Sequence, residues 1–453
     1  MGFRLKVLEY GKIKSAEIEA APLTLFVGDN NSGKSYLMFL LWGIRNFGAE
    51  VLLGNAFESM TEPENRLLGW VREHVEKAQE QGKCTADVGK IARELQLVLQ
   101  ESVNRNKNKL LKTIFNSSDV KIKELQIELT DLDKASFSFS FDVLGGRAGI
   151  FLQTDGASVG YGTLFSEREQ DTGKVDRITL EILVKIVYDF LLNNGHIDSG
   201  LNKHIYLPAA RTGFMLTKDV INKFGRRETF NIGAEREAVA PFVRPINQFL
   251  DVINDLVLDR AGNEKFADII NYLERDMADG TVEMSTLPNK DVFYVPKGKR
   301  SGIPLRVVSA VVTELSPLIL ILKHKDKLDT IFYEEPEMCL HPQLQQKMAR
   351  VICRLVNAGV DMGVTTHSDI ILQHVNNMIR LSRRKDREEI CRQLDYSADD
   401  LLTPDRVKVY QLKAEAGGKT RVEELPCGEY GYKVPTFNDA LDRIMDEAYT
   451  IQE

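Results

Sequence analysis

The first fifty residues carry two short alternating segments, one apolar run and one apolar helix-like segment. Residues 5–8 and 16–19 mostly alternate between apolar and polar side chains, which predicts two short strands. Residues 23–27 have the length and β-propensity of a buried strand. A Gly-rich loop follows, and residues 34–44 then predict an apolar helix. The expected order is therefore two strands, a buried strand, a loop and a helix.

The region that follows changes from a helical to a strand pattern. Residues 57–115 are rich in Glu, Lys, Gln and Leu with amphipathic spacing, so they predict two helices with a turn at Gly82. Residues 121–164 alternate, which predicts an antiparallel meander whose hairpin turn is the Gly-Gly pair 145–146. Residues 180–193 predict another helix.

The rest of the chain alternates between strand-like and helix-like segments. No linker rich in Pro, Gly or Ser interrupts it, so we expect insertions into one core rather than separate domains. The predicted strands are 204–207, 292–295, 329–333 and 363–366, with a hairpin of 406–413 and 420–425, and the predicted helical segments are 245–277, 309–322, 343–357 and 436–449.

Composition and charge are those of an ordinary globular chain. The 453 residues hold 59 Lys and Arg against 66 Asp and Glu, so the net charge of −7 gives no strong nucleic-acid footprint, although local patches can still bind. The most apolar stretch, residues 315–322, is far shorter than the ~18–20 residues of a membrane span. The five cysteines are scattered without a C-x-x-C pair, and no signal peptide is visible. We therefore expect a cytoplasmic protein without disulfides.

Residues 28–35 form the clearest motif in the chain. They read Gly-Asp-Asn-Asn-Ser-Gly-Lys-Ser and match the phosphate-binding pattern G-x-x-x-x-G-K-[ST], between a buried strand and a helix. Glycines let the backbone wrap a phosphate, whose charge is met by N–H groups at the helix N-terminus. Lys34 is expected to reach the β- and γ-phosphates of ATP, and the Ser35 hydroxyl to ligate Mg²⁺. The predicted nucleotide-binding residues are Gly28, Asn30, Asn31, Ser32, Gly33, Lys34 and Ser35.

A second motif closes an apolar strand with carboxylates. Residues 331–337 read Ile-Phe-Tyr-Glu-Glu-Pro-Glu. In a P-loop protein this is a Walker B element, in which Glu334 would hold the Mg²⁺ shell and Glu335 would orient or deprotonate the attacking water. The alternative is a solvated acidic turn. Two carboxylates at the end of a buried strand crowd negative charge that a cation relieves, which favours the functional interpretation.

His367 follows a further short strand, within Thr-Thr-His-Ser at residues 365–368. At the end of a strand, its imidazole is predicted to contact the γ-phosphate. Taken alone, the motif would be better explained by a surface histidine in a turn. The Walker A and Walker B elements before it favour the catalytic interpretation.

Together these motifs resemble the ABC-type ATPases, in the branch that includes SMC, RecF and the OLD-like AAA family ATPases. The resemblance is carried by the Asn-Ser-Gly-Lys-Ser Walker A, the Glu-Glu-Pro-Glu Walker B, the Leu-His-Pro of residues 340–342 and the final Thr-His-Ser. In that branch residues 340–342 occupy the D-loop and His367 is the switch histidine. The resemblance covers residues 3–370 in order and spacing.

The resemblance implies an α/β fold, a P-loop NTPase with an ABC-type ATPase head whose mixed sheet is flanked by helices. We assign the head to residues 1–50 and 200–453, with a helical subdomain at about 235–290. Residues 51–199 are then a helical and antiparallel-β insertion, which is a candidate for dimerisation or partner binding.

The family also implies a signature helix, which completes the nucleotide site of a partner subunit. Its usual Ser-Gly-Gly-like motif is missing here, and the candidates are Ser301-Gly302 and Ser309-Ala310. We favour Ser309, because a helix N-terminus presents its hydroxyl and free N–H groups to a γ-phosphate. Residues 309–315 also resemble the degenerate Ser-Ser-x-x-x-Glu-Leu signature of OLD-like members.

Residues 207–212, Leu-Pro-Ala-Ala-Arg-Thr, resemble a segment that follows a core strand in the same OLD-like group. The resemblance makes Arg211 a candidate sensor of phosphate. An ordinary surface arginine is an equally good explanation of this residue, so both interpretations stay open.

OLD-type nucleases carry a Toprim nuclease domain after the ATPase. Only 453 − 367 = 86 residues follow His367 here, with Asp399-Asp400 as a lone acidic pair, so we expect no nuclease in this chain. Long SMC-type arms and a zinc hook are missing as well. The basic stretches, such as residues 297–300 and 383–385, are more typical of solvated faces than of a DNA track.

The sequence therefore predicts an ATP hydrolase that works as a nucleotide-gated clamp, with ATP and Mg²⁺ as cofactors. At least two copies of the chain would sandwich the nucleotide, and no membrane is involved. The resemblance implies a sensor or regulatory ATPase subunit of an anti-phage defence system, acting with a separate nuclease or toxin effector. One alternative is RecF- or SMC-like DNA repair with DNA as a partner. The other is an ATP-locked scaffold with negligible turnover.

Overall fold

The computed structural model describes residues 3–52, 61–130, 136–142, 147–154, 157–163, 183–185, 203–229, 242–258, 263–287, 290–325, 327–415, 417–434 and 445–451. The chain forms two compact units. Unit 1 comprises residues 1–20 and 43–201, and unit 2 comprises residues 21–42 and 202–453. The division into a core and an insertion that was drawn from the sequence stays a prediction.

A mixed sheet forms the centre of unit 2. Five of its strands run parallel to their neighbours, and the sixth described strand, β16, pairs antiparallel with β15. This confirms the predicted α/β class and the hairpin near the end of the chain. The spatial order is β16 (Thr420–Leu425), β15 (Val407–Ala414), β3 (Leu23–Gly28), β14 (Asp361–Thr366), β13 (Thr330–Glu334) and β9 (His204–Leu207).

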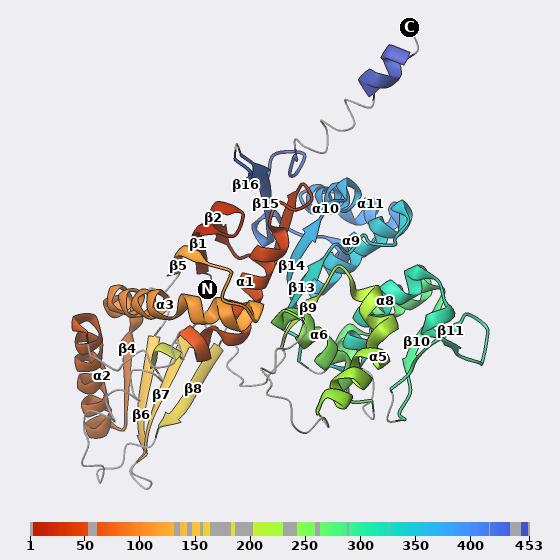
Figure 1. Cartoon of the computed structure of the whole chain (residues 1–453). Coiled ribbons are helices and arrows are strands. Elements are labelled where there is room, and N and C mark those ends of the chain that lie inside the picture. Colours follow the sequence, from red (N-terminus) through yellow and green to blue (C-terminus); the bar gives the residue numbers. More distant parts are fainter. Residues whose placement is uncertain are drawn as a thin grey trace. The chain divides into compact units, whose positions relative to one another are not determined.

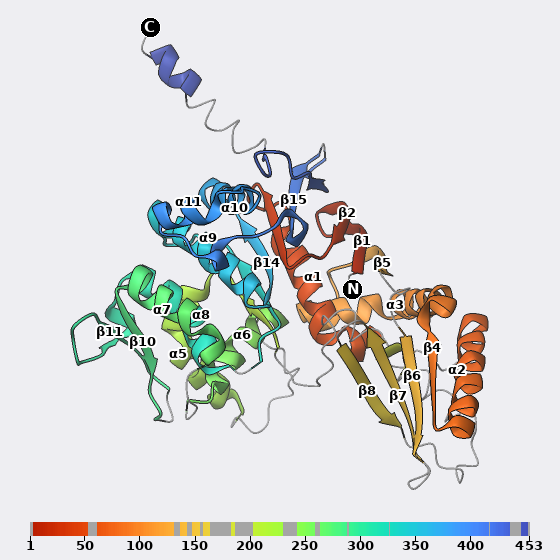
Figure 2. The same cartoon turned by 180° about the vertical axis from the view of Figure 1, so that it is seen from behind.

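Helices cover both faces of this sheet (Figures 1 and 2). Leu25, Ile331 and Val364 join one buried core with residues of α6, α8, α9 and α10. Because side chains alternate along a strand, Gly363 turns to the other face. There α1 packs so closely that a Cβ on Gly363 would lie 3.5 Å from Met38 Sδ. These helices are α1 (Lys34–Phe47), α6 (Arg244–Asp255), α8 (Ala310–His324), α9 (Pro342–Asn357) and α10 (Asp369–Ser382).

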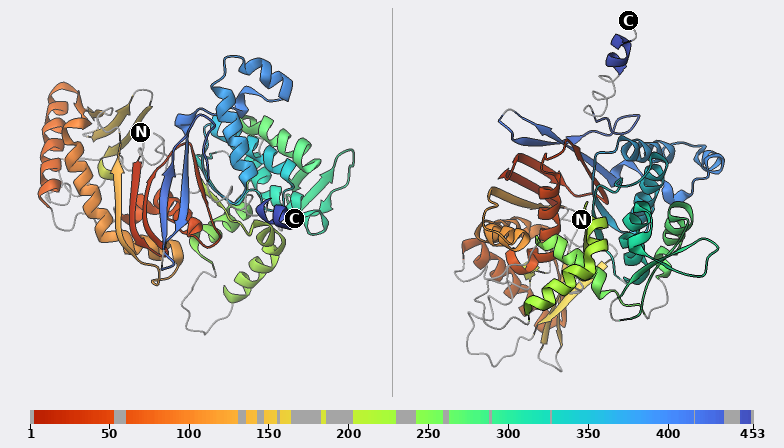
Figure 3. Two further views of the ribbon diagram at one scale, coloured as in Figure 1. Left: turned by 90° about the horizontal axis from the view of Figure 1, so that it is seen from above. Right: turned by 45° about the vertical axis from the view of Figure 1, so that its right-hand side comes forward.

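A helical block and a small antiparallel sheet complete the middle of unit 2. The block confirms the helical segment predicted at 245–277, and the strand predicted at 292–295 is β11. The small sheet contacts α8 and η5, and its β10–β11 hairpin projects outward from the helices (Figures 1 and 3). The elements are α5 (Arg211–Thr229), η4 (Glu264–Phe266), α7 (Ala267–Tyr272), η5 (Leu273–Ala278), β10 (Gly280–Met284), β11 (Val292–Pro296), β12 (Ile303–Pro304) and η6 (Leu305–Val307).

Unit 2 also contains helices that the sequence pattern did not predict. The helices α5, α10 and α11 were not predicted, although α10 buries a stripe of residues at helical spacing, as in Ile371, Val375 and Met378. The remaining bounds are α11 (Arg387–Leu394), η7 (Ala398–Asp400) and η8 (Pro404–Arg406). Within the described ranges, no helix is long and apolar enough to cross a membrane.

Unit 1 holds two antiparallel sheets and two long helices. The helix α2 packs against β4 and β6, and α3 packs against β5. The helix α2 begins with a capping box, in which the Thr61 N–H donates to Glu64 Oε2 at 2.6 Å, and it ends at Gly82 with φ +77°. The elements are β1 (Phe3–Tyr10), β2 (Ile13–Glu19), η1 (Gly48–Leu52), α2 (Glu62–Gln81), β4 (Lys83–Asp87), η2 (Val88–Ile91), α3 (Ala92–Phe115), β5 (Ile122–Leu129), β6 (Ser136–Asp142), β7 (Arg147–Thr154) and β8 (Ala157–Thr163).

Two details of unit 1 differ from the sequence prediction. The segment after Gly82 is the strand β4, because it pairs with β6 and sets Ala86 opposite Phe137. The strand β5 leaves the meander and pairs with β1, in the order β5-β1-β2, while β4, β6, β7 and β8 form the second sheet. The predicted turn at 145–146, most of the predicted helix 180–193 and the first nine residues of the predicted helix 436–449 lie outside the described residues.

Candidate active site

Three neighbouring parallel strands of unit 2 end at one edge of the sheet. Val27 of β3 is in register with Thr366 of β14, and Thr365 is in register with Glu334 of β13. The phosphate loop, the acidic segment and His367 each follow one of these strand ends directly. The parallel topology therefore brings together three motifs that are far apart in the sequence, as expected for a ligand site at the carboxyl ends of strands.

The phosphate loop begins with Gly28, at a position where a side chain would not fit. Gly28 has φ +145°, and a Cβ there would lie 2.7 Å from the carbonyl oxygen of Leu412 on β15. Asn31 takes a left-handed φ of +61°, which asparagine tolerates better than most residues. The helix α1 begins at Lys34, so its first N–H groups face the loop that precedes them. This backbone fits the anion cradle expected from the motif, and phosphate binding by the loop stays a prediction.

Lys34 lies inside the loop with only 6% of its surface exposed. Its Nζ donates to the carbonyl oxygens of Gly28 at 3.0 Å and Asp29 at 2.8 Å. Burial lowers the pKa of the Lys34 ammonium, and the nearby carboxylates of Glu335 and Asp29 oppose that shift. The charge is therefore held next to both the loop and the acidic segment, where an incoming phosphate could replace the two carbonyl oxygens.

Glu334 and Ser35 offer the oxygen atoms that a divalent cation would need. Glu334 is 6% exposed, and its Oε2 accepts from the Ala209 N–H at 3.2 Å. Its Oε1 is buried and has no hydrogen-bond partner among the described residues. The Ser35 side chain is exposed in the first turn of α1. A partnerless carboxylate oxygen and an accessible hydroxyl fit Mg²⁺, which prefers oxygen ligands.

Glu335 and His367 face each other at the ends of β13 and β14. His367 Nε2 lies 3.6 Å from Glu335 Oε1, and both side chains are about one third exposed. The imidazole lowers the pKa of the Glu335 carboxyl more than burial raises it. Glu335 is thus an ionised and accessible carboxylate, which suits it to hold a water molecule. Their catalytic roles stay a prediction.

Glu337 is a functional candidate that sequence reasoning did not assign. Its Oε1 accepts from the His367 N–H at 2.6 Å, so it fixes the segment that carries the imidazole. Burial raises the pKa of the Glu337 carboxyl, and the His367 N–H opposes the shift. Its other oxygen, Oε2, is buried without a hydrogen-bond partner among the described residues. The Glu-Glu-Pro-Glu motif contained the signal, but not the direction of this side chain.

Arg211 corrects one of the two interpretations drawn from the sequence, because it is not a surface arginine. It opens α5 and is 0% exposed. Its NH1 donates to the carbonyl oxygens of Pro208 at 2.9 Å and Glu334 at 2.7 Å, and its NH2 donates to that of Glu335 at 2.9 Å. It also forms an ion pair with Glu314 of α8. A phosphate-sensing role stays a prediction, while the observed contacts are with the main chain of the Walker B segment.

Ser309 stands where the sequence predicted, directly before α8. Its side chain is exposed and makes no capping hydrogen bond to the helix. The other candidate, Ser301, precedes β12 rather than a helix. The structure thus leaves the Ser309 hydroxyl and the first N–H groups of α8 available to a ligand, and its role as the signature residue stays a prediction.

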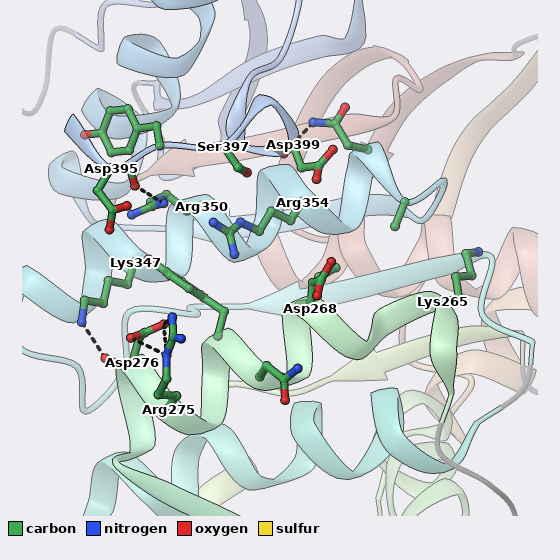
Figure 4. Close-up of a pocket in the computed structure, with 16 residues that line it drawn as sticks. Lys265, Asp268, Arg275, Asp276, Lys347, Arg350, Arg354, Asp395, Ser397 and Asp399 are labelled. Carbon is green, nitrogen blue, oxygen red and sulfur yellow. Dashed lines mark hydrogen bonds and ion pairs between the residues drawn. The ribbon is translucent and has the colours of Figure 1, made fainter. Parts of the chain in front are cut away.

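A polar pocket of about 640 Å³ lies between α7, η5, α9 and the loop after α11, away from the predicted nucleotide site. None of the predicted site residues lines it. Figure 4 shows Arg350 and Arg354 reaching into it from α9. Both guanidinium groups also bond to Asp400, at 2.8 Å and 2.6 Å, so they tie α9 to η7. Asp399, which the sequence analysis noted with Asp400 as a lone acidic pair, lies at the pocket lining.

Comparisons with known proteins identify the family of the chain. The sequence matches the family model described as an AAA ATPase domain over residues 4–372. No curated protein matches the chain. Similar solved structures include the SMC head domain from Thermotoga maritima, with 11% identity, coverage of 93% of this chain and 98% of that chain, and a TM-score of 0.34.

Two further SMC head structures are similar over most of the chain. One is the SmcHead bound to the C-winged helix domain of ScpA, with 12% identity, coverage of 93% and 96%, and a TM-score of 0.35. The other is the Smc head domain with an extended coiled coil bound to the C-terminal domain of ScpA derived from Pyrococcus furiosus, with 11% identity, coverage of 99% of each chain and a TM-score of 0.35.

Fold, site and family match define a P-loop ATPase. The chain belongs to the AAA ATPase domain family. The family match confirms the AAA family ATPase that the motifs indicated, and the chain is an ATP hydrolase.

Proposed function

We propose that this ATPase is a nucleotide-gated clamp, in which ATP joins two copies of the chain and hydrolysis releases them. The proposal is carried by the meeting of Lys34, Glu335 and His367 at one edge of three parallel strands. It is supported by the exposed start of α8, where the Ser309 hydroxyl is not used for capping. One chain would supply the Walker elements and the other the N-terminus of α8.

Each residue of the site has a proposed task. The N–H groups of the phosphate loop and the Lys34 ammonium would meet the phosphates, with Lys34 exchanging the Gly28 and Asp29 carbonyls for phosphate oxygens. The Glu335 carboxylate would accept a hydrogen bond from the attacking water and aim it at the γ-phosphate. His367 would contact the γ-phosphate beside it. Glu337 would hold the main chain of His367 in place.

Mg²⁺ is the proposed metal cofactor. Glu334 would hold it through the Oε1 that has no partner among the described residues, and Ser35 through its hydroxyl. When bound, the ion would offset the negative charge of the phosphates. Glu334 Oε2 would keep its hydrogen bond from the Ala209 N–H, which holds the carboxylate in this direction.

The clamp follows from the charge of the γ-phosphate. The first N–H groups of a helix stabilise an anion, so the start of α8 would bind a partner's ATP more tightly than its ADP. Loss of the γ-phosphate then weakens the contact between the two copies. The dimer would therefore form with ATP and open after hydrolysis.

We further propose that the clamp is the sensor or regulatory subunit of an anti-phage defence system. The support is the resemblance of the Walker, Arg211 and Ser309 segments to stand-alone OLD-like ATPases, which often work beside a separate nuclease or toxin. In this arrangement the nucleotide state of the clamp would restrain or release the effector. The ATPase itself would carry out no cleavage of nucleic acid.

Purification from the native host tests this role. The tagged chain is isolated with Mg-ATP present, and the Lys34→Ala variant is isolated in parallel as the control. A stoichiometric nuclease or toxin that is lost from the variant would support the restrained effector. Recovery of the chain alone from both preparations would contradict it. A steady-state phosphate-release assay on the same protein tests the alternative of an ATP-locked scaffold. Continuous release of phosphate would rule that alternative out.

DNA binding is a second candidate function, favoured by the cations after β11. Lys297, Lys299 and Arg300 are exposed, and the described residues give them no ion-pair partner. Two copies in a clamp would double this positive patch. ATP-dependent binding of duplex DNA should then weaken with salt, with a slope of about −0.9 per phosphate contacted. Strong binding without any effector protein would make a DNA-repair clamp the better interpretation.

A further inference from the structure

We propose that the buried ion pair between Arg211 and Glu314 is a positioning link, through which a second copy seated on the start of α8 sets the geometry of Glu335. The proposal rests on the proposed function, because it assumes two copies and a water held by Glu335. Arg211 and Glu314 act here through the main chain and not on the substrate. They are therefore positioning residues.

The link begins with a pair of charges that are wholly removed from water. Arg211 is 0% exposed and Glu314 is 1% exposed. The NH2 of Arg211 forms the ion pair with Glu314 Oε1, and the Thr212 hydroxyl donates to Glu314 Oε2. Arg211 and Thr212 open α5, and Glu314 is the fifth residue of α8. The pair therefore ties together the N-terminal ends of two helices.

The same guanidinium holds the Walker B main chain. It donates to the carbonyl oxygens of Glu334 at 2.7 Å and Glu335 at 2.9 Å. Glu335 has φ +42°, a left-handed backbone that a residue with a side chain adopts only when its surroundings hold it there. The Glu335 N–H is held by the carbonyl oxygen of Thr365 at 2.9 Å. The direction of the Glu335 carboxylate thus depends on where Arg211 stands.

The helix α8 connects this pair to the surface. Ser309 and Ala310 are exposed, whereas residues 312–322 are continuously buried. The Thr313 N–H donates to the carbonyl oxygen of Ser309 at 3.1 Å, so the exposed end is hydrogen-bonded to the turn that carries Glu314. A packed interior transmits a displacement rather than absorbing it. A nucleotide presented to Ser309 by a second copy would therefore shift Glu314, and Arg211 with it.

Stability alone does not account for the pair. Transfer of two charges from water to the interior opposes folding, and apolar residues of similar volume often replace such a pair without loss. Apolar side chains would hold α5 against α8, but they could not bond the carbonyls of Glu334 and Glu335. A planar guanidinium with several donors can make all these bonds at once. What the arginine adds is directional contact between α8 and the active site.

Two conservative variants cut the link at either end. Glu314→Gln keeps the size of the side chain and an acceptor for Thr212, but removes the charge that faces Arg211. Arg211→Lys keeps the charge, but its compact ammonium lacks the planar fork whose two terminal nitrogens reach different partners. We expect each variant to lower kcat about tenfold while the equilibrium Kd for ATP stays within about threefold of the parent. Equal losses in Kd and kcat would show damage to the whole site and overturn the proposal.

The double variant separates one link from two independent defects. If both residues act through the same link, Arg211→Lys combined with Glu314→Gln should lower kcat no further than the more damaging of the two single variants does. If the two losses multiply, each residue acts separately and the proposal is wrong. The matched control is Lys323→Met, which removes another ion pair of α8, 2.7 Å from Glu274. This variant should keep kcat within about twofold of the parent.

The dependence of turnover on protein concentration distinguishes failure of the positioning link from failure of the clamp. In the parent, turnover per chain should rise with concentration as copies pair, and Glu335→Gln should lower that turnover about 10²-fold or more at every concentration. In Glu314→Gln, turnover per chain should no longer rise, although ATP still binds. A parent whose turnover is independent of concentration would contradict the clamp itself. A Glu314→Gln variant that responds as the parent does would leave the clamp standing and overturn only the positioning link.

Discussion

His367 Nε2 lies 3.6 Å from Glu335 Oε1, at the ends of two neighbouring parallel strands. The imidazole is the main cause of the lowered pKa of the Glu335 carboxyl. Through this contact the residue that follows β14 favours the charged form of the carboxylate that follows β13. Glu335, the proposed base, and His367, the proposed γ-phosphate contact, are therefore expected to act together.

Glu335→Gln should trap the closed clamp. The amide keeps the shape of the side chain but cannot accept a proton, so ATP binds while hydrolysis slows by about 10²-fold or more. Phosphate release measures turnover, and size-exclusion chromatography with ATP should show a stable dimer. Glu429→Gln, on the exposed surface, is the matched control and should leave both readouts unchanged. Hydrolysis by Glu335→Gln at the parental rate would show that another residue positions the water.

Lys34→Ala should remove the response of the protein to ATP without unfolding it. The Lys34 ammonium donates to carbonyl oxygens of its own loop, at 3.0 Å and 2.8 Å, and burial lowers its pKa despite the nearby carboxylates, so this charge adds no net stability to the fold. The parent should be stabilised by ATP by about 2.7 kcal/mol at a hundredfold excess over Kd, seen as a higher Tm. The variant should show the parental Tm without ATP and no rise with it. Lys408→Ala, which breaks the surface pair with Glu424, should retain the full rise.

Gly28→Ala should block the phosphate loop for steric reasons. The new Cβ would lie 2.7 Å from the carbonyl oxygen of Leu412, in a backbone with φ +145°. Either the loop or β15 must move, so ATP affinity should fall by at least about tenfold and Tm should drop. Gly417→Ala, at a surface turn with φ +87° and no atom within 4 Å of the new Cβ, carries a similar backbone penalty without the clash. If Gly417→Ala lowers ATP affinity as much as Gly28→Ala, the steric explanation is wrong.

Sequence reasoning found the parts of the site that local patterns determine. The phosphate loop, the acidic strand end and the Thr-His-Ser segment are each contiguous, and each follows a strand that its apolar residues predict. The start of α8 at Ser309 was predicted for the same reason, because a helix N-terminus has a local signal. Topology then needed only parallel pairing of these strands to bring the motifs together.

The parts that depend on distant partners escaped prediction. Arg211 is buried because it bonds to Glu314 and to main-chain carbonyl oxygens, and all of these partners except Pro208 are far from it in the sequence. The strand β4 is decided by its pairing with β6, which overrides the helical pattern on either side of it. Asp400 was noted only as half of a lone acidic pair. Its contacts with Arg350 and Arg354 could not be predicted, because only the folding of unit 2 brings these residues together.

Asp400→Asn should destabilise unit 2 in a manner that depends on pH. Asp400 is 0% exposed and bonds to Arg350 at 2.8 Å and to Arg354 at 2.6 Å. Burial alone would raise the pKa of its carboxyl, but the hydrogen bonds from Arg354, Arg350 and the Ser397 N–H hold that pKa below the ordinary value. Removal of the Asp400 charge leaves the two guanidinium groups without a counter-ion, which should lower the free energy of unfolding by about 3 kcal/mol. Tm at pH 7 should fall by about 6 °C.

The sign of the pH effect follows from the lowered pKa of Asp400. The folded protein favours the carboxylate more than the unfolded chain does, so the stabilisation is complete above the ordinary aspartate pKa of about 3.9. It is lost as the pH falls through that value towards the lower pKa of the folded state. The Tm difference between parent and Asp400→Asn should therefore be constant from pH 7 to pH 5 and shrink below about pH 4. The pKa of Asp386 is also lowered, by Arg384, but that pair is exposed, so Asp386→Asn should shift Tm by no more than about 1 °C at any of these values. A Tm difference that persists unchanged at pH 3 would mean that the asparagine acts through packing and not through the lost charge.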